Sequence, residues 1–405
     1  MDFSLPAEIE DLRLRVRELV TRRIIPVESE RASFDAHENI AAPVLNQIRA
    51  EVKAAGLWAP QIAREHGGLG LPYVGVAALY EEMGRSIFGA VCFNCAAPDD
   101  GNMRLLQQAG TPEQKKWWLQ PVVDGQVRSA FAMTEPMPGS GSDPAGAMLT
   151  RAERVGGRWV IRGRKWFITG AGDARHLIVL ARTSDHPRKG LTAFLFHADQ
   201  PGWRIIRRIP IMGPEEHGGH CELEFDGLEV ADENVLLNVG DGLKVTQIRL
   251  GPARLTHCMR WLGMAQRALQ IAGEYVRERD SFGSKLAAHE GVQWLLGEAA
   301  MEIEMGRLLT MRAAWRLDQK ELARQDISMA KIQVSETLHK AVDTALQLLG
   351  ARGYSKDTPV EWMYRYARQA RLVDGASEVH RMVLANLYLE AMSAGQSKDF
   401  WRWGA

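Results

Sequence analysis

The sequence predicts a mainly helical α+β protein in three parts. These are an N-terminal helical domain at residues 1–128, a middle antiparallel β domain at 129–236 and a C-terminal four-helix bundle at 237–405. The prediction rests on a hydrophobic period that changes from helical to two-residue spacing and back again. It also rests on a length of 405 residues, enough for several packed modules.

The first two parts differ in local pattern. Residues 9–20 form an amphipathic, helix-like segment, and a glycine-rich loop follows at 67–72. In the middle part, residues 221–226 (CELEFD) alternate apolar and acidic side chains, as a half-buried strand does. Other short apolar runs, separated by turn residues, predict further strands at 159–161, 177–180 and 194–196.

The third part returns to helical spacing and keeps it. Apolar residues recur every three or four positions through two long stripes, 262–276 and 327–348. Stripes of this length predict long helices that bury one face against each other, as in a helical bundle.

Composition and charge exclude several classes of protein. The chain is 46% hydrophobic and 25% charged, with 50 basic and 50 acidic residues, so its formal net charge is zero. A nucleic-acid-binding or membrane-surface protein normally has a basic excess, and no apolar run is long enough for a membrane span. Four cysteines are too few for a disulfide scaffold, which favours a reducing, cytoplasmic location.

Several motifs do not account for the chemistry. Cys92 and Cys95 have CxxC spacing, but a zinc site needs a second pair, so buried structural cysteines are the better interpretation. A di-iron bundle needs two Glu-x-x-His units, and only 336–339 fits, so we predict no metal. Residues 217–220 (HGGH) predict a tight turn before a strand, with a role in lining a pocket as the alternative. Neither a Rossmann fingerprint nor a P-loop is present.

Two segments of the β domain are suited to a flavin. Residues 131–136 (FAMTEP) precede a glycine- and serine-rich run, and 163–170 (GRKWFITG) combines aromatic, Thr and Gly residues. Such strand ends offer N–H groups and hydroxyls to a flavin ring or to phosphates, and an aromatic side chain can cover the ring. Together, in this domain order, the segments resemble the acyl-CoA dehydrogenase family.

The resemblance covers nearly the whole chain. It includes 67–70 (GGLG), 110–116 (GTPEQKK), 279–283 (RDSFG), 347–353 (QLLGARG) and 371–378 (RLVDGASE). Residues 250–254 (LGPAR) and 257–260 (HCMR) are similar to the branch of acyl-CoA dehydrogenase family members 10 and 11. Animal members of that branch carry a kinase-like domain, which we expect to be absent here or supplied by a separate protein.

The resemblance implies an FAD-dependent enzyme that converts an acyl-CoA thioester to the trans-2-enoyl-CoA. Asp374 occupies the position of the base that removes the α-proton, while the flavin N5 takes the β-hydride. Aspartate is one methylene shorter than the usual glutamate, so its backbone should be shifted or its substrate displaced. The family also implies an electron-transfer flavoprotein as acceptor and a homo-oligomer, either a dimer or a tetramer.

The same resemblance assigns binding residues. Those for FAD are Phe131, Met133, Thr134, Ser140, Ser142, Trp166, Phe167, Thr169, Arg279, Phe282, Gln347, Gly350, Ala376 and Glu378. Those for the substrate are Ser142, Arg254 and Gly375. The link before Ser142 is longer than usual, so Ser140 is an alternative to it as the phosphate contact. Arg279 and Gln347 should reach the FAD of a neighbouring subunit.

Three alternatives remain open from the sequence. The first keeps the fold but changes the reaction, because acyl-CoA oxidases use oxygen and nitroalkane oxidases use an aspartate base. The second is a flavin-bearing structural subunit without turnover, against which the retained Asp374 argues. The third is the di-iron bundle protein, which a visible spectrum with metal analysis would distinguish.

Overall fold

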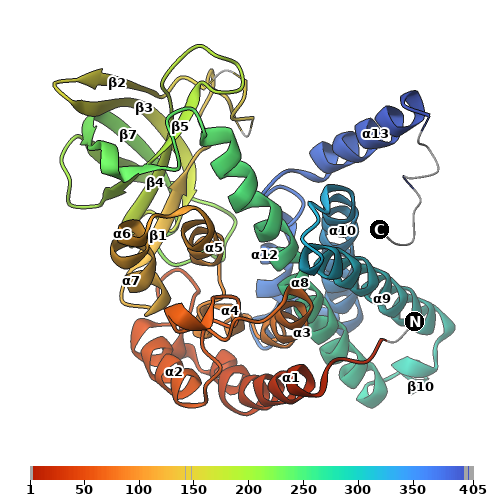
Figure 1. Ribbon diagram of the computed structural model, residues 1–405. Coiled ribbons are helices and arrows are strands. Elements are labelled where there is room, and N and C mark those ends of the chain that lie inside the picture. The colour runs from red at the N-terminus through yellow and green to blue at the C-terminus, as the bar shows by residue number, and fades with distance from the viewer. Residues whose placement is uncertain (1–2, 142, 147, 396–399, 401–405) are drawn as a thin grey trace. The chain divides into compact units, whose positions relative to one another are not determined.

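The computed structural model describes residues 3–141, 143–146, 148–395 and 400 (Figure 1). Its contacts divide the chain into two compact units. The helical unit comprises Met1–Arg31, Pro72–Ala90 and Arg254–Ala405, and the sheet unit comprises Ala32–Leu71 and Val91–Ala253. The predicted order of N-terminal helices, middle β-sheet and C-terminal helical bundle is confirmed. The predicted boundaries at 128/129 and 236/237 lie where the hydrophobic period changes along the sequence, and they stay predictions.

The sheet unit is built on one large sheet. Its strands are β1 Arg128–Ala132, β2 Arg151–Val155, β3 Arg158–Thr169, β4 Ala174–Arg182, β5 Leu191–His197, β6 Trp203–Arg208, β7 His220–Val230 and β8 Val235–Leu236. They run in the order β6-β7-β3-β2-β4-β5-β8, with β1 on β4. Most pairs are antiparallel, as expected. β1 instead runs parallel to β4, and a single parallel pairing joins β2 to β4.

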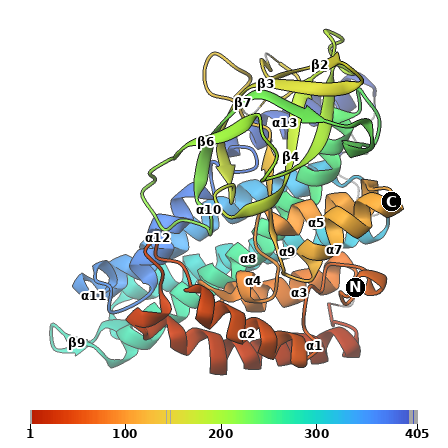
Figure 2. The same ribbon diagram turned by 90° about the vertical axis from the view of Figure 1, so that its left-hand side faces the viewer.

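Short helices accompany the sheet. They are α2 Ala42–Ala54, the second half of α4 Gly89–Cys92, α5 Asp99–Ala109, α6 Pro112–Gln114, a π-helical turn Lys115–Leu119, α7 Gln120–Val123, most of the 3-10 turn Arg31–Ser33 and the 3-10 turns Arg64–His66 and Asp232–Asn234. α5 lies against β1 (Figures 1 and 2). The carboxylate of Asp99, the first residue of α5, accepts hydrogen bonds from the backbone N–H and the hydroxyl of Ser129, at 2.7 Å each. This fixes the start of α5 to the strand that leads into the predicted flavin segment.

The alternation predicted at 221–226 is confirmed in β7. Cys221, Leu223 and Phe225 are buried in the core of the sheet unit. Glu222 is buried as well, and it receives hydrogen bonds from Arg164 and Arg207. The pairing explains why a buried carboxylate is tolerated at that position.

The helical unit contains the long helices. Its elements are α1 Ala7–Leu19, a π-helical turn Val20–Ile24, a 3-10 turn Ile25–Ser29, α3 Tyr73–Gly84, most of α8 Gly242–Glu278, β9 Asp280–Ser281, β10 Ser284–Lys285, a 3-10 turn Leu286–Ala288, α9 Glu290–Asp318, α10 Arg324–Leu349, α11 Ala351–Tyr354, α12 Val360–Gln369 and α13 Ser377–Ser393. The two predicted stripes fall in α8 and α10. α10 contacts α9, α12 and α13, so it forms the centre of this unit.

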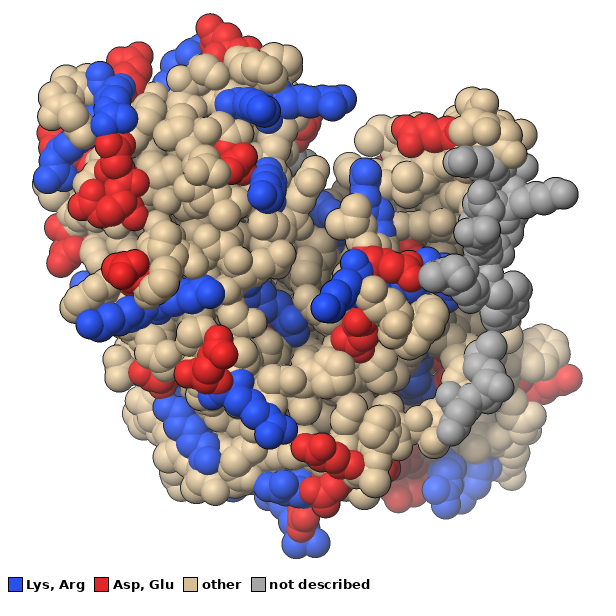
Figure 3. Space-filling view, in the orientation of Figure 1, with Lys and Arg blue, Asp and Glu red and all other residues tan. Residues whose placement is uncertain are grey.

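Charged side chains of both signs are mixed over the visible face of the molecule (Figure 3). This agrees with the balanced charge of the sequence. Within the described residues, the helices are too short or too polar for any of them to be a candidate membrane span.

Two glycines allow α3 and α8 to approach closely within the helical unit. A Cβ atom added at Gly263 of α8 would overlap the carbonyl oxygen of Glu81 in α3. A Cβ added at Gly84 of α3 would in turn overlap the carbonyl oxygen of Arg260 in α8. The obstructing atoms are backbone atoms, so a side chain cannot rotate away to make room.

Gly263→Ala should therefore destabilise the protein, by about 1–3 kcal/mol, because the two helices must separate. Gly273→Ala is the matched control, since no atom lies within 4 Å of its added Cβ in the same helix. That change should be neutral or should raise stability by about 0.5–1 kcal/mol through better helix propensity. Equal urea midpoints for the two variants would contradict the close approach.

Candidate active site

The loop between α12 and α13 presents Asp374. Its φ angle is +52°, in the left-handed region that residues other than glycine seldom occupy. Gly375 follows with φ +99°, and a Cβ there would come 2.9 Å from Nε2 of His380. Backbone strain of this kind persists only where surrounding contacts hold it, and it is frequent at functional sites.

Three side chains of the helical unit hold this loop by donating hydrogen bonds. Arg254 donates from Nε to the carbonyl oxygen of Asp374 at 2.7 Å. Lys331, which is fully buried, donates from Nζ to the carbonyl oxygen of Ala370 at 2.8 Å and lies 3.5 Å from that of Gly375. Nε2 of His257 lies 3.2 Å from Oδ2 of Asp374. The base candidate is therefore fixed at both its backbone and its side chain.

The surroundings of this loop disfavour additional positive charge. Burial, together with the charges of Arg254 and Lys331, lowers the pKa of His380 to about 4. Burial also lowers the pKa of Lys331 and raises the pKa of the Cys258 thiol to about 12. Both histidines beside Asp374 are thus kept towards the neutral form.

The predicted flavin residues of the sheet unit come together around β1 and β3. Met133 and Thr134 follow β1, and their carbonyl oxygens accept hydrogen bonds from Nζ of Lys165 (2.9 Å) and the backbone N–H of Trp166 (3.0 Å). Phe131 lies in β1, with the guanidinium of Arg249 5.0 Å from its ring centroid. The two sequence segments suited to a flavin are therefore neighbours in space.

A β-bulge shapes the β3 segment. Lys165 pairs with Leu223 and Ile168 with Cys221, so Trp166 and Phe167 together oppose a single residue of β7. Phe167 has φ +51° and is 43% exposed, and it meets Trp166 edge-on, with ring centroids 5.0 Å apart. Bulges of this kind redirect side chains beside active sites, which suits the predicted role of Phe167 over a ring.

A buried ion pair anchors the loop after Thr134. Nζ of Lys165 lies 3.0 Å from the carboxylate of Glu135, which also accepts the backbone N–H groups of Leu149 (2.7 Å) and Thr150 (2.8 Å). Burial lowers the pKa of Lys165 to about 8 despite this pairing. For Glu135, Lys165 and the backbone donors outweigh the effect of burial and lower its pKa.

The structure describes one of the two serines, Ser140 and Ser142, that are candidates for the phosphate contact. The hydroxyl oxygen of Ser140 is buried and has no hydrogen-bond partner within the described residues. Ser142 lies outside the described residues. The hydroxyl of Thr169 lies 3.0 Å from Nδ1 of His220. A buried hydroxyl without a partner among the described residues, beside the Thr134 segment, suits a hydrogen bond to a phosphate or ribityl group. This favours a ligand-binding role for Ser140 over a purely structural one.

The remaining predicted FAD residues lie in the helical unit and do not form one cluster there. Arg279 and Phe282 belong to the β9–β10 hairpin, where Phe282 is 96% exposed. Gln347 and Gly350 lie at the end of α10, whereas Ala376 and Glu378 lie at the start of α13. Figures 1 and 2 place the hairpin at the far end of the unit from α13. The roles of these residues stay predictions.

Sequence reasoning did not identify His257, Lys331 or His380 as site residues, and it assigned Arg254 a different role. Arg254 was predicted to contact the substrate, whereas its visible bond holds the backbone of Asp374. His257 stands three positions after Arg254, nearly one helical turn, so the two share a helix face. That spacing was the available signal for His257. Lys331 lies in α10, remote in sequence, and offered none.

Three family models cover most of the chain. The N-terminal domain of acyl-CoA dehydrogenase matches residues 6–126, its middle domain 130–228 and its C-terminal domain 240–389. The chain therefore belongs to the acyl-CoA dehydrogenase family, whose members are FAD-binding oxidoreductases.

Similar proteins support the same assignment. The chain is 37% identical over 402 residues to a Mycobacterium tuberculosis protein named probable acyl-CoA dehydrogenase FadE2, with 96% of this chain and 97% of that one covered. It is 36% identical to acyl-CoA dehydrogenase family member 11 of Gallus gallus, covering 93% of this chain but 50% of the relative. It thus spans about half the length of that vertebrate relative. A solved complex of glutaryl-CoA dehydrogenase with glutaryl-CoA is 28% identical, with a TM-score of 0.84 and coverage of 98% and 97%.

The depressed pKa of His380 predicts a pH-dependent stability. Between pH 6.5 and about 4 the unfolded state takes up a proton at this residue and the folded state does not, so stability falls with falling pH. His380→Gln removes this contribution. The stability of the variant relative to the parent should improve as the pH is lowered from 7 to 5. Chemical denaturation at both pH values measures this, and an unchanged difference would contradict it.

Proposed function

We propose that this protein catalyses the FAD-dependent α,β-dehydrogenation of an acyl-CoA thioester to the trans-2-enoyl-CoA, with Asp374 as the base. The observation that carries the proposal is the Asp374 carboxylate on a strained loop held by Arg254, His257 and Lys331. Family membership and the glutaryl-CoA complex of a related dehydrogenase support an acyl-CoA as the substrate class.

The chemistry requires a positioned base. An α-proton of a thioester is weakly acidic, so its removal needs a carboxylate within reach and donors for the thioester oxygen. The side chain of Asp374 is 18% exposed, which leaves it partly open to a ligand. Asp374 would receive the α-proton on its carboxylate.

The residues of the sheet unit fit a flavin. Thr134 and Thr169 would offer hydrogen bonds, Trp166 and Phe167 would cover the ring, and Ser140 has a buried hydroxyl that lacks a partner within the described residues. FAD, when bound, would supply the acceptor for the hydride that leaves the β-carbon. The orphaned hydroxyl and the exposed ring of Phe167 are the observations that support this fit.

Asp374→Asn tests the assignment of the base. The amide keeps the size and polarity of the side chain but cannot take the proton. We therefore expect FAD content and acyl-CoA affinity to change little, while the rate of flavin reduction falls about 100- to 10,000-fold. The visible spectrum gives the FAD content, and anaerobic stopped-flow measurement of flavin bleaching with a panel of acyl-CoA thioesters gives the affinity and the rate.

Asp374→Glu is the companion variant. It retains a carboxylate on a longer side chain and should keep part of the activity with an altered preference for chain length. If Asp374→Asn reduces its flavin at the parental rate, the base lies elsewhere.

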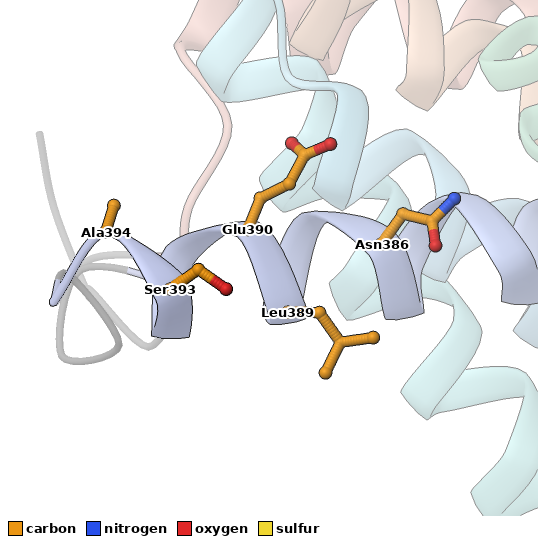
Figure 4. A pocket seen from close by; sticks show the side chains of 5 residues that line it. All are labelled: Asn386, Leu389, Glu390, Ser393 and Ala394. Carbon is orange, nitrogen blue, oxygen red and sulfur yellow. The ribbon is translucent and has the colours of Figure 1, made fainter.

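We further propose that the chain forms a homo-oligomer. On α9, the exposed residues Trp294, Met301, Met305 and Leu308 fall on one helix face. On α13, a shallow hollow is lined by Asn386, Leu389, Glu390, Ser393 and Ala394 (Figure 4). Leu389 is exposed there and points away from Asn386 and Glu390 (Figure 4). The exposed apolar stripe of α9 is the kind of surface that marks an interaction site, and a second copy of this chain is the expected occupant.

Met301→Glu should therefore shift the protein to a smaller species, because it places a charge in the exposed stripe of α9. Leu322→Glu makes the same change at an exposed apolar residue outside that stripe and is the control. Sedimentation velocity measures the assembly. The same mass for the parent and for Met301→Glu would contradict an interface through α9.

An electron-transfer flavoprotein is the proposed electron acceptor, and a cytoplasmic location is part of the proposal. The location is supported by the four cysteines, which are buried and too few for a disulfide scaffold, as suits a reducing compartment. The alternative is a flavin oxidase of the same fold. Rapid release of hydrogen peroxide by the substrate-reduced enzyme in air would favour that alternative.

A further inference from the structure

Both ring nitrogens of His257 have partners in the helical unit. Nε2 lies 3.2 Å from Oδ2 of Asp374, and Nδ1 lies 3.1 Å from a terminal nitrogen of Arg260. The ring stacks on Trp261, with centroids 4.9 Å apart and an interplanar angle of 24°. His257 is buried, so these contacts replace water around the ring.

Arg260 fixes the tautomer of His257. A guanidinium only donates hydrogen bonds, so Nδ1 of His257 must present its lone pair to Arg260. The proton of the neutral ring is then on Nε2, which faces the Asp374 carboxylate. The guanidinium of Arg260 is itself placed by the ring of Tyr80, 5.6 Å from its centroid.

The surroundings favour the neutral form of this ring. Burial lowers the pKa of His257, and the positive charges of Arg260 and Lys331 lower it further, against the opposing effect of Asp374. A neutral N–H orients a carboxylate without forming an ion pair. An ion pair would stabilise the ionised carboxylate more strongly and weaken it as a base.

We propose that His257 is a positioning residue for the base, holding Asp374 through the N–H of a neutral imidazole whose tautomer Arg260 fixes. This inference rests on the proposed function of Asp374. His257 does not serve as a proton relay, because its Nε2 already carries a proton and its Nδ1 is occupied by Arg260.

The need for such a residue follows from the shape of the loop. Arg254 and Lys331 donate hydrogen bonds to backbone carbonyl groups of the loop. These bonds fix the backbone, whereas a carboxylate turns about its own side-chain bonds unless its oxygen atoms are held. His257 supplies the side-chain contact that limits this rotation. Misplacement of a reacting group by about 1 Å can cost roughly a hundredfold in rate.

The kinetic test compares His257→Leu, which removes the donor, with His257→Gln, which restores an N–H donor on a neutral side chain. His257→Leu should reduce flavin about 10- to 100-fold more slowly, with acyl-CoA affinity and FAD content little changed. The acidic limb of its kcat/KM profile should move to higher pH, because a carboxylate that loses a donor is harder to ionise. His257→Gln should recover most of the rate.

His339→Leu is the control. His339 lies in α10 beside Tyr364, with ring centroids 5.8 Å apart, so its loss should leave the rate and the pH profile unchanged. If His257→Leu matches the parent in rate and pH profile, the proposal is overturned. Equal losses for His257→Leu and His257→Gln would also overturn it, because they would indicate a packing role.

A second measurement does not depend on turnover. Nitrogen-15 NMR of histidine-labelled protein should show His257 neutral with its proton on Nε2, and Arg260→Met should introduce the other tautomer. A proton on Nδ1 in the parent would overturn the proposal. If the NMR result holds but no acyl-CoA reduces the flavin of the parent, the proposed function fails and the positioning geometry stands.

Discussion

The left-handed backbone of Asp374 is the constraint on which the candidate active site depends. A residue other than glycine with φ +52° has a strained backbone, and neighbouring side chains supply the contacts that hold Asp374 in this conformation. α8 provides Arg254 and His257, and α10 provides Lys331. The packing of α8 and α10 thus places three hydrogen-bond donors beside the loop that carries Asp374.

Burial decides how those donors behave. A cluster of cationic side chains around one carboxylate would form ion pairs and reduce its basicity if every member were charged. Burial instead lowers the pKa of His257 and His380, so both tend towards neutral donors or acceptors. The charged Arg254 donates a hydrogen bond to the backbone carbonyl of Asp374. His257, a group kept towards the neutral form, therefore contributes to orienting the carboxylate.

Local patterns in the sequence predicted much of the fold. The stripe at 327–348 predicted α10, and the alternation at 221–226 predicted β7, because both periods follow directly from helix and strand geometry. The parallel pairing of β1 with β4 was not predictable, since register between distant segments leaves no local period. The division of α1 and α2 between two units was equally hidden, because a period shows that a face is buried but not against which partner.

The site was predictable only in part. Asp374 was found through its resemblance to a family segment, whereas the donors that hold it come from two other helices remote in sequence. The account is tested most directly by α-proton exchange on a 3-thia-acyl-CoA, whose β-sulfur cannot release a hydride. Incubated in D₂O with the FAD-loaded protein, the ligand should gain deuterium at its α-carbon, as read by mass spectrometry, and Asp374→Asn should abolish the gain. Exchange at the parental rate in Asp374→Asn would contradict the assignment of Asp374 as the base.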